Sequence, residues 1–306
     1  MGQGQCSADL WQARPPFVCD NAPLESLPES VAYAIPSARG CLSVGERRHP
    51  AMNLPANSFK QALADGRRQL GAFLALGDAH AAELMATAGF DWLLIDCEHG
   101  PNDLRSVLAQ LQALAGYTVQ AVLRPADHDP ARIKQYLDLG VRSLLAPMVD
   151  TAEQAQALVA AMRYPPRGIR GVGAGMARAA RWGSVAGYYA QAETELCLAV
   201  QVETLAGLEN LDAIAAVDGV DGVFLGPADL AAALGHLGQP MHAAVRAAVE
   251  QALPRIRAAG KAAGVYCADP DLAAGYGALG ASFFLIGADA ILLRTAAAAA
   301  LARFAS

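Results

Sequence analysis

From residue 58 onward, short apolar runs alternate regularly with segments of helical periodicity. Eight apolar runs suited to strands occupy residues 70–76, 91–96, 118–124, 142–146, 198–202, 223–225, 263–267 and 282–286. Apolar strands that alternate with helices are typical of parallel sheets covered by helices. The count and order predict a (β/α)8 barrel of one α/β domain. The alternative is a doubly wound open sheet, which usually has fewer strands and a glycine-rich turn after the first one.

Helices are expected at residues 58–65, 79–89, 103–115, 130–139, 151–163, 184–194, 205–217, 242–258, 270–279 and 288–304. Asp150 and Glu153 have the spacing of a capping box before one of them. Pro254 lies inside another and is expected to kink or cut it.

The stretch 198–230 reads as strand, helix and strand, with Glu203 at the end of the first strand and Asp229 after the second. Parallel neighbours end at the same edge of a sheet, so both carboxylates are expected at the carboxyl-terminal edge, where α/β proteins build their sites. Two hard oxygen ligands suit Mg²⁺, Mn²⁺ or a similar cation. The alternative for Asp229 is a helix N-cap.

Further polar residues follow other strands. Asp96, Glu98 and His99 come at the end of the second strand, Arg124 ends the third, and Gln201 lies in the fifth. His99 is the plausible base at neutral pH, although histidines after strands are often structural. Arg124 could pair with a carboxylate ligand, stabilise an oxyanion, or form a salt bridge across the barrel mouth. Glu98 is expected to be structural.

A loop rich in glycine and arginine, residues 164–183, interrupts the alternation. Its glycines could cradle a phosphate, with Arg167, Arg170, Arg178 and Arg181 nearby. It follows a helix and not a strand, so the dinucleotide-binding pattern lacks its required context. We favour a loop at the active site or at a subunit contact.

Composition narrows the class of protein. The net charge is −6 and basic blocks are absent, so nucleic-acid binding is not expected. No apolar run approaches the length of a membrane span, and we expect no signal peptide, because no basic-then-apolar segment opens the sequence. The six cysteines form no CxxC motif or Cys/His cluster, which fits a reduced, cytoplasmic compartment.

Residues 1–51 differ from the rest, since they hold 6 of the 17 prolines and show no periodicity. We expect a disordered N-terminal extension there. Met52 begins a segment that looks like a natural protein start, so the start of the chain is expected to be mis-assigned. A single domain is expected over residues 52–306.

Six motifs together resemble the HpcH/HpaI aldolase family, the metal-dependent class II pyruvate aldolases. They are FDWLLIDCEHGPND (90–103), LRP (123–125), APMV (146–149), YPPRGIRGVG (164–173), VQVET (200–204) and GVDGVFLGPADL (219–230). The resemblance implies a (β/α)8 barrel of the phosphoenolpyruvate/pyruvate-binding type. It also implies a homohexamer, built as a trimer of dimers, that exchanges its last helix between subunits. The alanine-rich residues 294–302 would belong to that helix.

The resemblance also implies roles for particular residues. Glu203 and Asp229 would bind a divalent metal, Mg²⁺, Mn²⁺ or Co²⁺. Pyruvate would contact Gln201, Arg124, Asp229 and the backbone around Ala228, and Arg124 would stabilise the enolate charge.

Three further residues complete the implied site. His99 would be the acid/base, supported by Asp138 near the end of the helix at residues 130–139, and Asp96 would hold metal-bound water. The implied reaction is reversible cleavage of 4-hydroxy-2-keto acids to pyruvate and an aldehyde. Phe73 and Cys97 stand where the family often has tryptophan and a small residue, which leaves the aldehyde open.

Two other functions compete. One is a CoA-thioester lyase of the citrate lyase β type, which would need a more basic mouth than this acidic chain suggests. The other is a non-catalytic scaffold that binds a keto acid. The intact set of His99, Arg124, Glu203 and Asp229 argues against that loss of catalysis.

Overall fold

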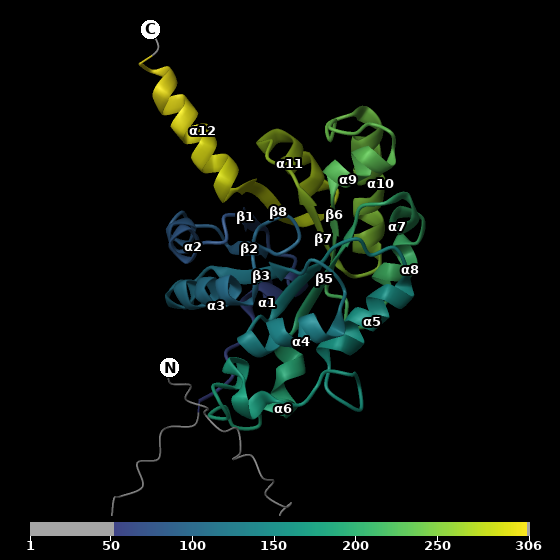
Figure 1. Ribbon diagram of the computed structural model, residues 1–306. Coiled ribbons are helices and arrows are strands. Elements are labelled where there is room, and N and C mark those ends of the chain that lie inside the picture. Colours follow the sequence, from purple (N-terminus) through teal and green to yellow (C-terminus); the bar gives the residue numbers. More distant parts are fainter. Residues whose placement is uncertain (1–51, 305–306) are drawn as a thin grey trace, which may run out of the picture. The chain divides into compact units, whose positions relative to one another are not determined.

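The computed structural model describes residues 52–304, in which eight parallel strands close into a barrel in sequence order (Figure 1). The strands are β1 (Gln69–Leu74), β2 (Trp92–Asp96), β3 (Gln120–Arg124), β4 (Ser143–Ala146), β5 (Cys197–Val202), β6 (Gly222–Leu225), β7 (Ala262–Tyr266) and β8 (Ala281–Ala288). Strand β1 pairs with both β2 and β8, so the sheet closes. The predicted (β/α)8 barrel is confirmed, and the open sheet is excluded.

Helices surround the barrel. The α-helices are α1 (Ser58–Ala64), α2 (Ala79–Ala86), α3 (Leu104–Ala113), α4 (Pro130–Leu139), α5 (Ala152–Met162), α6 (Tyr188–Gln191), α7 (Leu205–Glu209), α8 (Leu211–Ala215), α9 (Pro227–Ala233), α10 (Ala243–Ala258), α11 (Pro270–Ala278) and α12 (Asp289–Ala302). The 3-10 helices are η1 (Leu114–Gly116), η2 (Ala174–Met176), η3 (Arg178–Ala180) and η4 (Ala192–Glu195). The expected extension, residues 1–51, lies outside the described residues.

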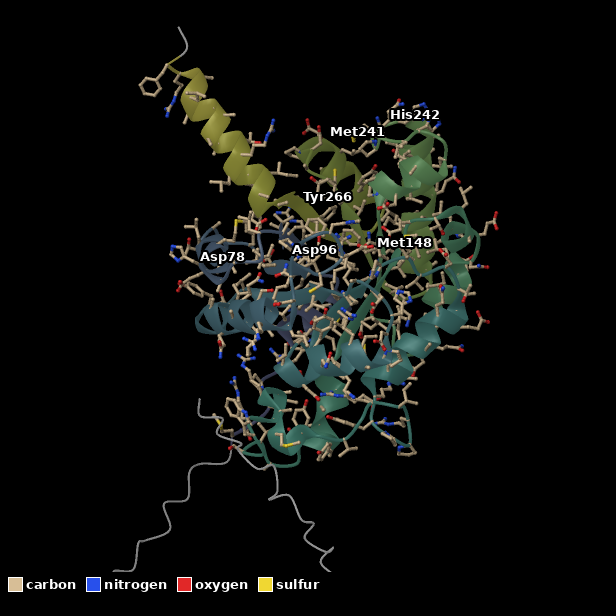
Figure 2. The ribbon with its side chains drawn as sticks, in the orientation of Figure 1. Asp78, Asp96, Met148, Met241, His242 and Tyr266 are labelled. Carbon is tan, nitrogen blue, oxygen red and sulfur yellow. The ribbon has the colours of Figure 1, made fainter. Side chains whose placement is uncertain are left out.

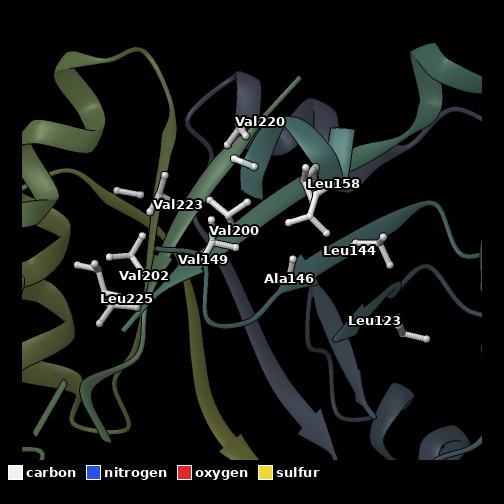
Figure 3. Close-up of a cluster of buried hydrophobic side chains, with 14 of the residues drawn as sticks. Leu123, Leu144, Ala146, Val149, Leu158, Val200, Val202, Val220, Val223 and Leu225 are labelled. Atoms are coloured by element: carbon white, nitrogen blue, oxygen red, sulfur yellow. The ribbon is translucent and has the colours of Figure 1, made fainter. Parts of the chain in front are cut away.

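Two apolar layers hold the barrel. The outer layer lies between strands and helices and includes Leu144, Val200 and Val223 (Figure 3). The inner layer fills the barrel and includes Trp92 and Phe283. Helix α1 adds Phe59 and Leu63 to that inner layer, because its own buried face packs against the barrel interior. The barrel is therefore a packed core, and a site can form only at its ends.

The residues that face the barrel interior change from apolar to polar toward the carboxyl ends of the strands. On β2 the buried Leu94 is followed two residues later by Asp96, and on β5 Ala199 is followed by Gln201. On β3, Arg124 follows the inner-layer Val122 at the same spacing. Alternate residues of a strand share a face, so these polar side chains point into the barrel mouth.

Helix starts differ in detail from the prediction. The capping box of α5 is formed by Thr151 and Gln154, one residue after the predicted pair Asp150 and Glu153. Asp150 instead accepts a hydrogen bond from the Thr204 hydroxyl. Pro254 does not cut the helix, because α10 runs through that residue with buried Leu253 and Ile256 on either side, and the alternative of a kink there stays a prediction.

Helix α12 extends away from the barrel (Figure 1), and its apolar side chains are exposed. Leu293 is 63% exposed and Leu301 73% exposed. Buried Asp289 holds the start of the helix, since its carboxylate accepts hydrogen bonds from the backbone N–H groups of Ala75 and Leu76. In the part of the chain that the structure describes, no helix is long and apolar enough to cross a membrane.

Candidate active site at the carboxyl ends of the strands

Arg124, the last residue of β3, is at the centre of a buried charge cluster. Its Nε and Nη2 donate to the two carboxylate oxygens of Asp96 on β2, at 2.9 and 2.8 Å. The two residues are neighbours in the strand register, which makes this bidentate pair possible. The guanidinium lies 5.0 Å from the centre of the Phe73 ring. A guanidinium has five N–H groups, so hydrogens on both terminal nitrogens are left for other partners.

Glu98 brings a second carboxylate to the same arginine. Its Oε2 lies 2.9 Å from Nη1 of Arg124, an ion pair that lacks hydrogen-bond geometry. Burial raises the pKa of Glu98, and the nearby Arg124 opposes that rise. The sequence suggested a structural role for Glu98, and the structure places it inside the cluster. No spacing signal in the sequence predicts this contact, because Glu98 lies beyond the end of β2, where the alternation of side chains in a strand no longer applies.

Glu203, directly after β5, is 2% exposed and is held at both oxygens. The backbone N–H of Met148 donates to Oε1 at 2.9 Å, and the Gln201 amide donates to Oε2. Met148, marked with Asp96 in Figure 2, has a φ of 53°, a strained value for this residue type. The pKa of Glu203 is raised to about 7, first by burial and also by the charge of Asp229, although the hydrogen bond from the Met148 N–H lowers it.

Asp229 lies in the first turn of α9 and is exposed. Gly226 occupies the N-cap position, and no side chain caps this helix, so the N-cap alternative for Asp229 is not supported. Gly226 is needed for space: a Cβ there would lie 2.4 Å from Glu203 Oε2 and 2.9 Å from the Gln201 amide nitrogen. The exposed Ala228 follows in the same turn.

Asp96 and Glu98 contact the Arg124 guanidinium, and the charge of Glu203 also acts on it. Asp229 lies near enough to Glu98 and Glu203 for its charge to raise the pKa of both. The excess of acid suits a cation. Gln201 Oε1 is buried and lacks a hydrogen-bond partner among the described residues, so it is open to a ligand. Across residues 52–304, no three His, Cys, Asp or Glu side chains form a metal-binding group. A cation here would need water or substrate oxygens besides Glu203 and Asp229.

His99 and Asp138 contact different partners. The His99 side chain is 70% exposed, and its Nε2 lies 3.8 Å from Glu98 Oε2. Asp138, on α4, accepts a 2.7 Å hydrogen bond from the fully buried Arg170. Within residues 52–304, no hydrogen bond or ion pair joins His99 to Asp138. The support of His99 by Asp138 therefore stays a prediction.

Asp96 also has a different set of partners from the expected one. Both of its oxygens bind Arg124, and Oδ1 also accepts from the backbone N–H of Glu98 at 3.1 Å. Its clearest role in these contacts is to orient the guanidinium. The expected hold on metal-bound water stays a prediction, as do the pyruvate contacts of Gln201 and Ala228.

Fold and site define a (β/α)8 barrel protein with an acid-rich cluster around one arginine at the carboxyl ends of its strands. A family model described as HpcH/HpaI aldolase/citrate lyase matches residues 69–296. The chain belongs to this family, which confirms the resemblance seen in its motifs.

Relatives and a solved structure agree with this assignment. The chain is 60% identical over 242 residues to a hydroxypyruvate/pyruvate aldolase of Pseudomonas aeruginosa, covering 79% of this chain and 90% of the relative. It is 57% identical over 255 residues to a 4-hydroxy-2-oxovalerate aldolase of Rhodococcus jostii, covering 83% and 98%. A crystal structure of a family member from Burkholderia cenocepacia is similar, with a TM-score of 0.79, 40% identity and coverage of 82% and 100%.

Proposed function

We propose that the chain is a divalent-metal-dependent aldolase that reversibly cleaves 4-hydroxy-2-keto acids to pyruvate and an aldehyde. The observation that carries the proposal is the acidic cluster at the carboxyl ends of the strands, in which Asp96 and Glu98 pair with Arg124 and Glu203 and Asp229 lie nearby. Relatives that are 60% and 57% identical are named aldolases, which confirms the lyase class expected from the sequence. The small-molecule substrate follows from the same names.

Glu203 and Asp229 would hold the cation, Mg²⁺, Mn²⁺ or Co²⁺. When bound, it would supply Lewis-acid polarisation of the keto-acid carbonyl. Glu203 is suited to this because the Met148 N–H and the Gln201 amide fix both of its oxygens. The pKa of Glu203 is raised because its carboxyl group is buried. A cation bound nearby would stabilise the charged carboxylate and lower this pKa again.

Arg124 would stabilise the negative charge that develops on the enolate oxygen. Asp96 holds it in a bidentate pair and Glu98 lies beside it, so little reorganisation is needed during the reaction. The N–H groups not bound to Asp96 are available to the substrate. Gln201, through its unpaired Oε1, and the backbone near Ala228 would orient pyruvate.

His99 would move the proton of the aldehyde oxygen, since its exposed ring lies at the mouth of the site beside Glu98. The lysines of this chain, Lys60, Lys134 and Lys261, are not at the carboxyl ends of the strands, so a Schiff base is not part of the proposal.

The exposed apolar side chains of α12 support a homo-oligomer in which this helix packs on a neighbouring subunit. We propose a hexamer built as a trimer of dimers, and a cytoplasmic location. Light scattering of the purified chain would give the subunit number directly.

The test is pyruvate release from a panel of 4-hydroxy-2-keto acids, measured with each metal and again with EDTA. We expect release that EDTA abolishes and that Mg²⁺, Mn²⁺ or Co²⁺ restores. Release that persists after thorough chelation would contradict metal dependence. If a folded oligomer releases no pyruvate with any metal, the aldolase proposal fails, and CoA thioesters become the next substrates to test.

A further inference from the structure

A cavity lies at the amino-terminal end of the barrel, opposite the candidate active site. Its volume is about 260 Å³. It is lined by residues just before β3, β4 and β5, by the ends of α3 and α4, and by the segment 178–196. The candidate active site is at the other ends of these strands, so the two sites are separate.

Three arginines line this cavity: Arg142, Arg178 and Arg181. The one acidic residue among the lining residues is Glu195, whose carboxylate accepts a 2.5 Å hydrogen bond from the Asn57 backbone. In the described chain, no carboxylate lies within salt-bridge distance of any of the three arginines. The cavity therefore carries an excess of positive charge.

The contacts of two arginines are with backbone carbonyl groups. Arg142 donates to the carbonyl of Pro55, and Arg178 donates to the carbonyl of Leu139 at 2.8 Å. Arg181 makes no side-chain hydrogen bond to another described residue. It has a φ of 49°, and the next residue, Trp182, has a φ of 53°, so two successive residues hold a backbone conformation that is rarely adopted.

The arginines also oppose one another. Burial lowers the pKa of Arg142 and of Arg178. The nearby Glu195 raises the pKa of Arg142, and the charge of Arg181 lowers the pKa of both arginines. Like charges gathered in a partly buried space are unfavourable unless an opposite charge joins them. A bound anion would supply that charge, and guanidinium groups match the geometry of carboxylate and phosphate oxygens.

The rest of the lining is apolar and aromatic. Leu111 and Leu114 come from the end of α3 and η1, Leu137 from α4, and Tyr117 and Tyr188 are also at the wall. A cationic side and an apolar side suit a ligand with both characters.

We propose that this cavity binds a small organic anion that joins a phosphate or carboxylate head to an apolar body. The head would lie against Arg142, Arg178 and Arg181, and the body against the leucines of the α3 and α4 ends. None of these residues belongs to the proposed aldolase site, so the two proposals stand or fall separately.

The test is isothermal titration of the full chain, with Mg²⁺ in a chloride buffer, using phenyl phosphate as the probe. Inorganic phosphate tests the head alone, and phenol tests the body alone. We expect phenyl phosphate to bind one site per chain at least tenfold more tightly than either fragment. Arg181→Gln should weaken binding by about tenfold or more, because a charged hydrogen bond is lost. Arg181→Lys should lie in between.

Controls separate this cavity from the active site. Arg105→Gln removes an exposed arginine of α3 outside the cavity and should leave the affinity unchanged. Glu203→Gln changes the other end of the barrel and should also retain phenyl phosphate binding. Arg142→Gln serves as a second cavity variant if Arg181→Gln does not fold, as judged by circular dichroism. The proposal is overturned if phenyl phosphate does not bind, if cavity variants bind it normally, or if Glu203→Gln abolishes binding.

Discussion

The two ends of the barrel carry opposite excesses of charge. At the carboxyl ends of the strands, the cluster around Arg124 holds the carboxyl groups of Asp96, Glu98 and Glu203, with Asp229 close to the last two. At the amino ends, three arginines face one glutamate across a cavity. At the carboxyl end, the bidentate Asp96–Arg124 pair balances part of the negative charge. At the amino end, arginine side chains donate to backbone carbonyl groups instead. Each end is thus suited to a ligand of the opposite sign, a cation at one and an anion at the other.

The ends also differ in how their residues are held. Asp96, Arg124 and Gln201 belong to strands, and their positions follow from the barrel register. Arg178 and Arg181 belong to a long connecting segment, and their positions depend on local backbone geometry. Groups that must be placed accurately for chemistry are better supported by strands than by loops. This difference fits catalysis at the carboxyl end and simple binding at the amino end.

The largest effect is expected from Glu203→Gln, which keeps the shape and removes the charge that would hold the metal. A bound cation stabilises the charge of the transition state by several kcal/mol, which corresponds to roughly a thousandfold in rate. Turnover should therefore fall by at least that factor. Pyruvate release at saturating metal measures it, and metal titration should show weakened binding.

A matched control for this change is Asp221→Asn. Asp221 is a mostly buried carboxyl group near the amino end of the barrel, where it accepts a 2.8 Å hydrogen bond from the Leu198 backbone. Burial raises its pKa, as for Glu203. This variant should lose stability but keep metal-dependent turnover. Near-normal turnover in Glu203→Gln would remove the metal assignment and with it the contrast between the two ends.

Arg124→Lys is expected to have the next largest effect. Lysine retains the charge but cannot make the bidentate pair with Asp96 or present the same N–H groups to the substrate. Loss of one stabilising donor costs about a hundredfold to a thousandfold in kcat. Steady-state kinetics should show the loss mainly in kcat, with a smaller change in KM. A loss confined to KM would mean that Arg124 only binds the ground state.

Sequence reasoning found the strand-end residues because their positions follow from simple geometry. Asp96 and Arg124 end neighbouring strands, and the register joins them directly. Their detailed partners were harder to predict, since Glu98 approaches Arg124 through the turn after β2. Asp138 binds Arg170, which belongs to a loop whose path depends on contacts far away in the sequence. The amino-end cavity could not be assembled from spacing, because Arg142 and Arg181 come from unrelated segments.

His99→Ala tests whether an exposed residue belongs to the carboxyl-end site. Removal of a proton-transfer group typically costs at least about a hundredfold, so cleavage should slow by about that factor. Deuterium exchange at the pyruvate methyl group does not involve the aldehyde oxygen, and we expect a smaller loss there. The measurement is cleavage rate beside exchange followed by proton NMR. Equal losses in both would place His99 at the enolisation step instead.

The excess of carboxyl groups at the carboxyl ends of the strands should also make the stability of the metal-free protein depend on pH. The pKa of Glu203 is raised to about 7 in the folded chain, from 4.5. A carboxyl group with a raised folded pKa stabilises the fold below its unfolded pKa, and that contribution is lost as pH rises through about 7. Urea unfolding in EDTA should therefore show stability falling between about pH 5 and 8, by at most about 3 kcal/mol. Glu203→Gln should flatten this fall, and an unchanged slope would assign it to other groups.

The smallest effect is expected at the amino end, from Arg181→Gln measured as stability in chloride buffer. The change removes a half-exposed charge that opposes Arg142 and Arg178. Because solvent screens such groups, we expect a gain of only a few tenths of a kcal/mol, on the order of a surface charge pair. The gain should appear in about 0.01 M salt and vanish near 1 M, where the screening length shortens from about 30 to about 3 Å. Thermal unfolding at both salt concentrations measures it. A loss of stability at low salt would mean that other groups already balance the charges of the three arginines. The two ends would then still differ in the sign of their charge, but the amino end would not need a bound anion.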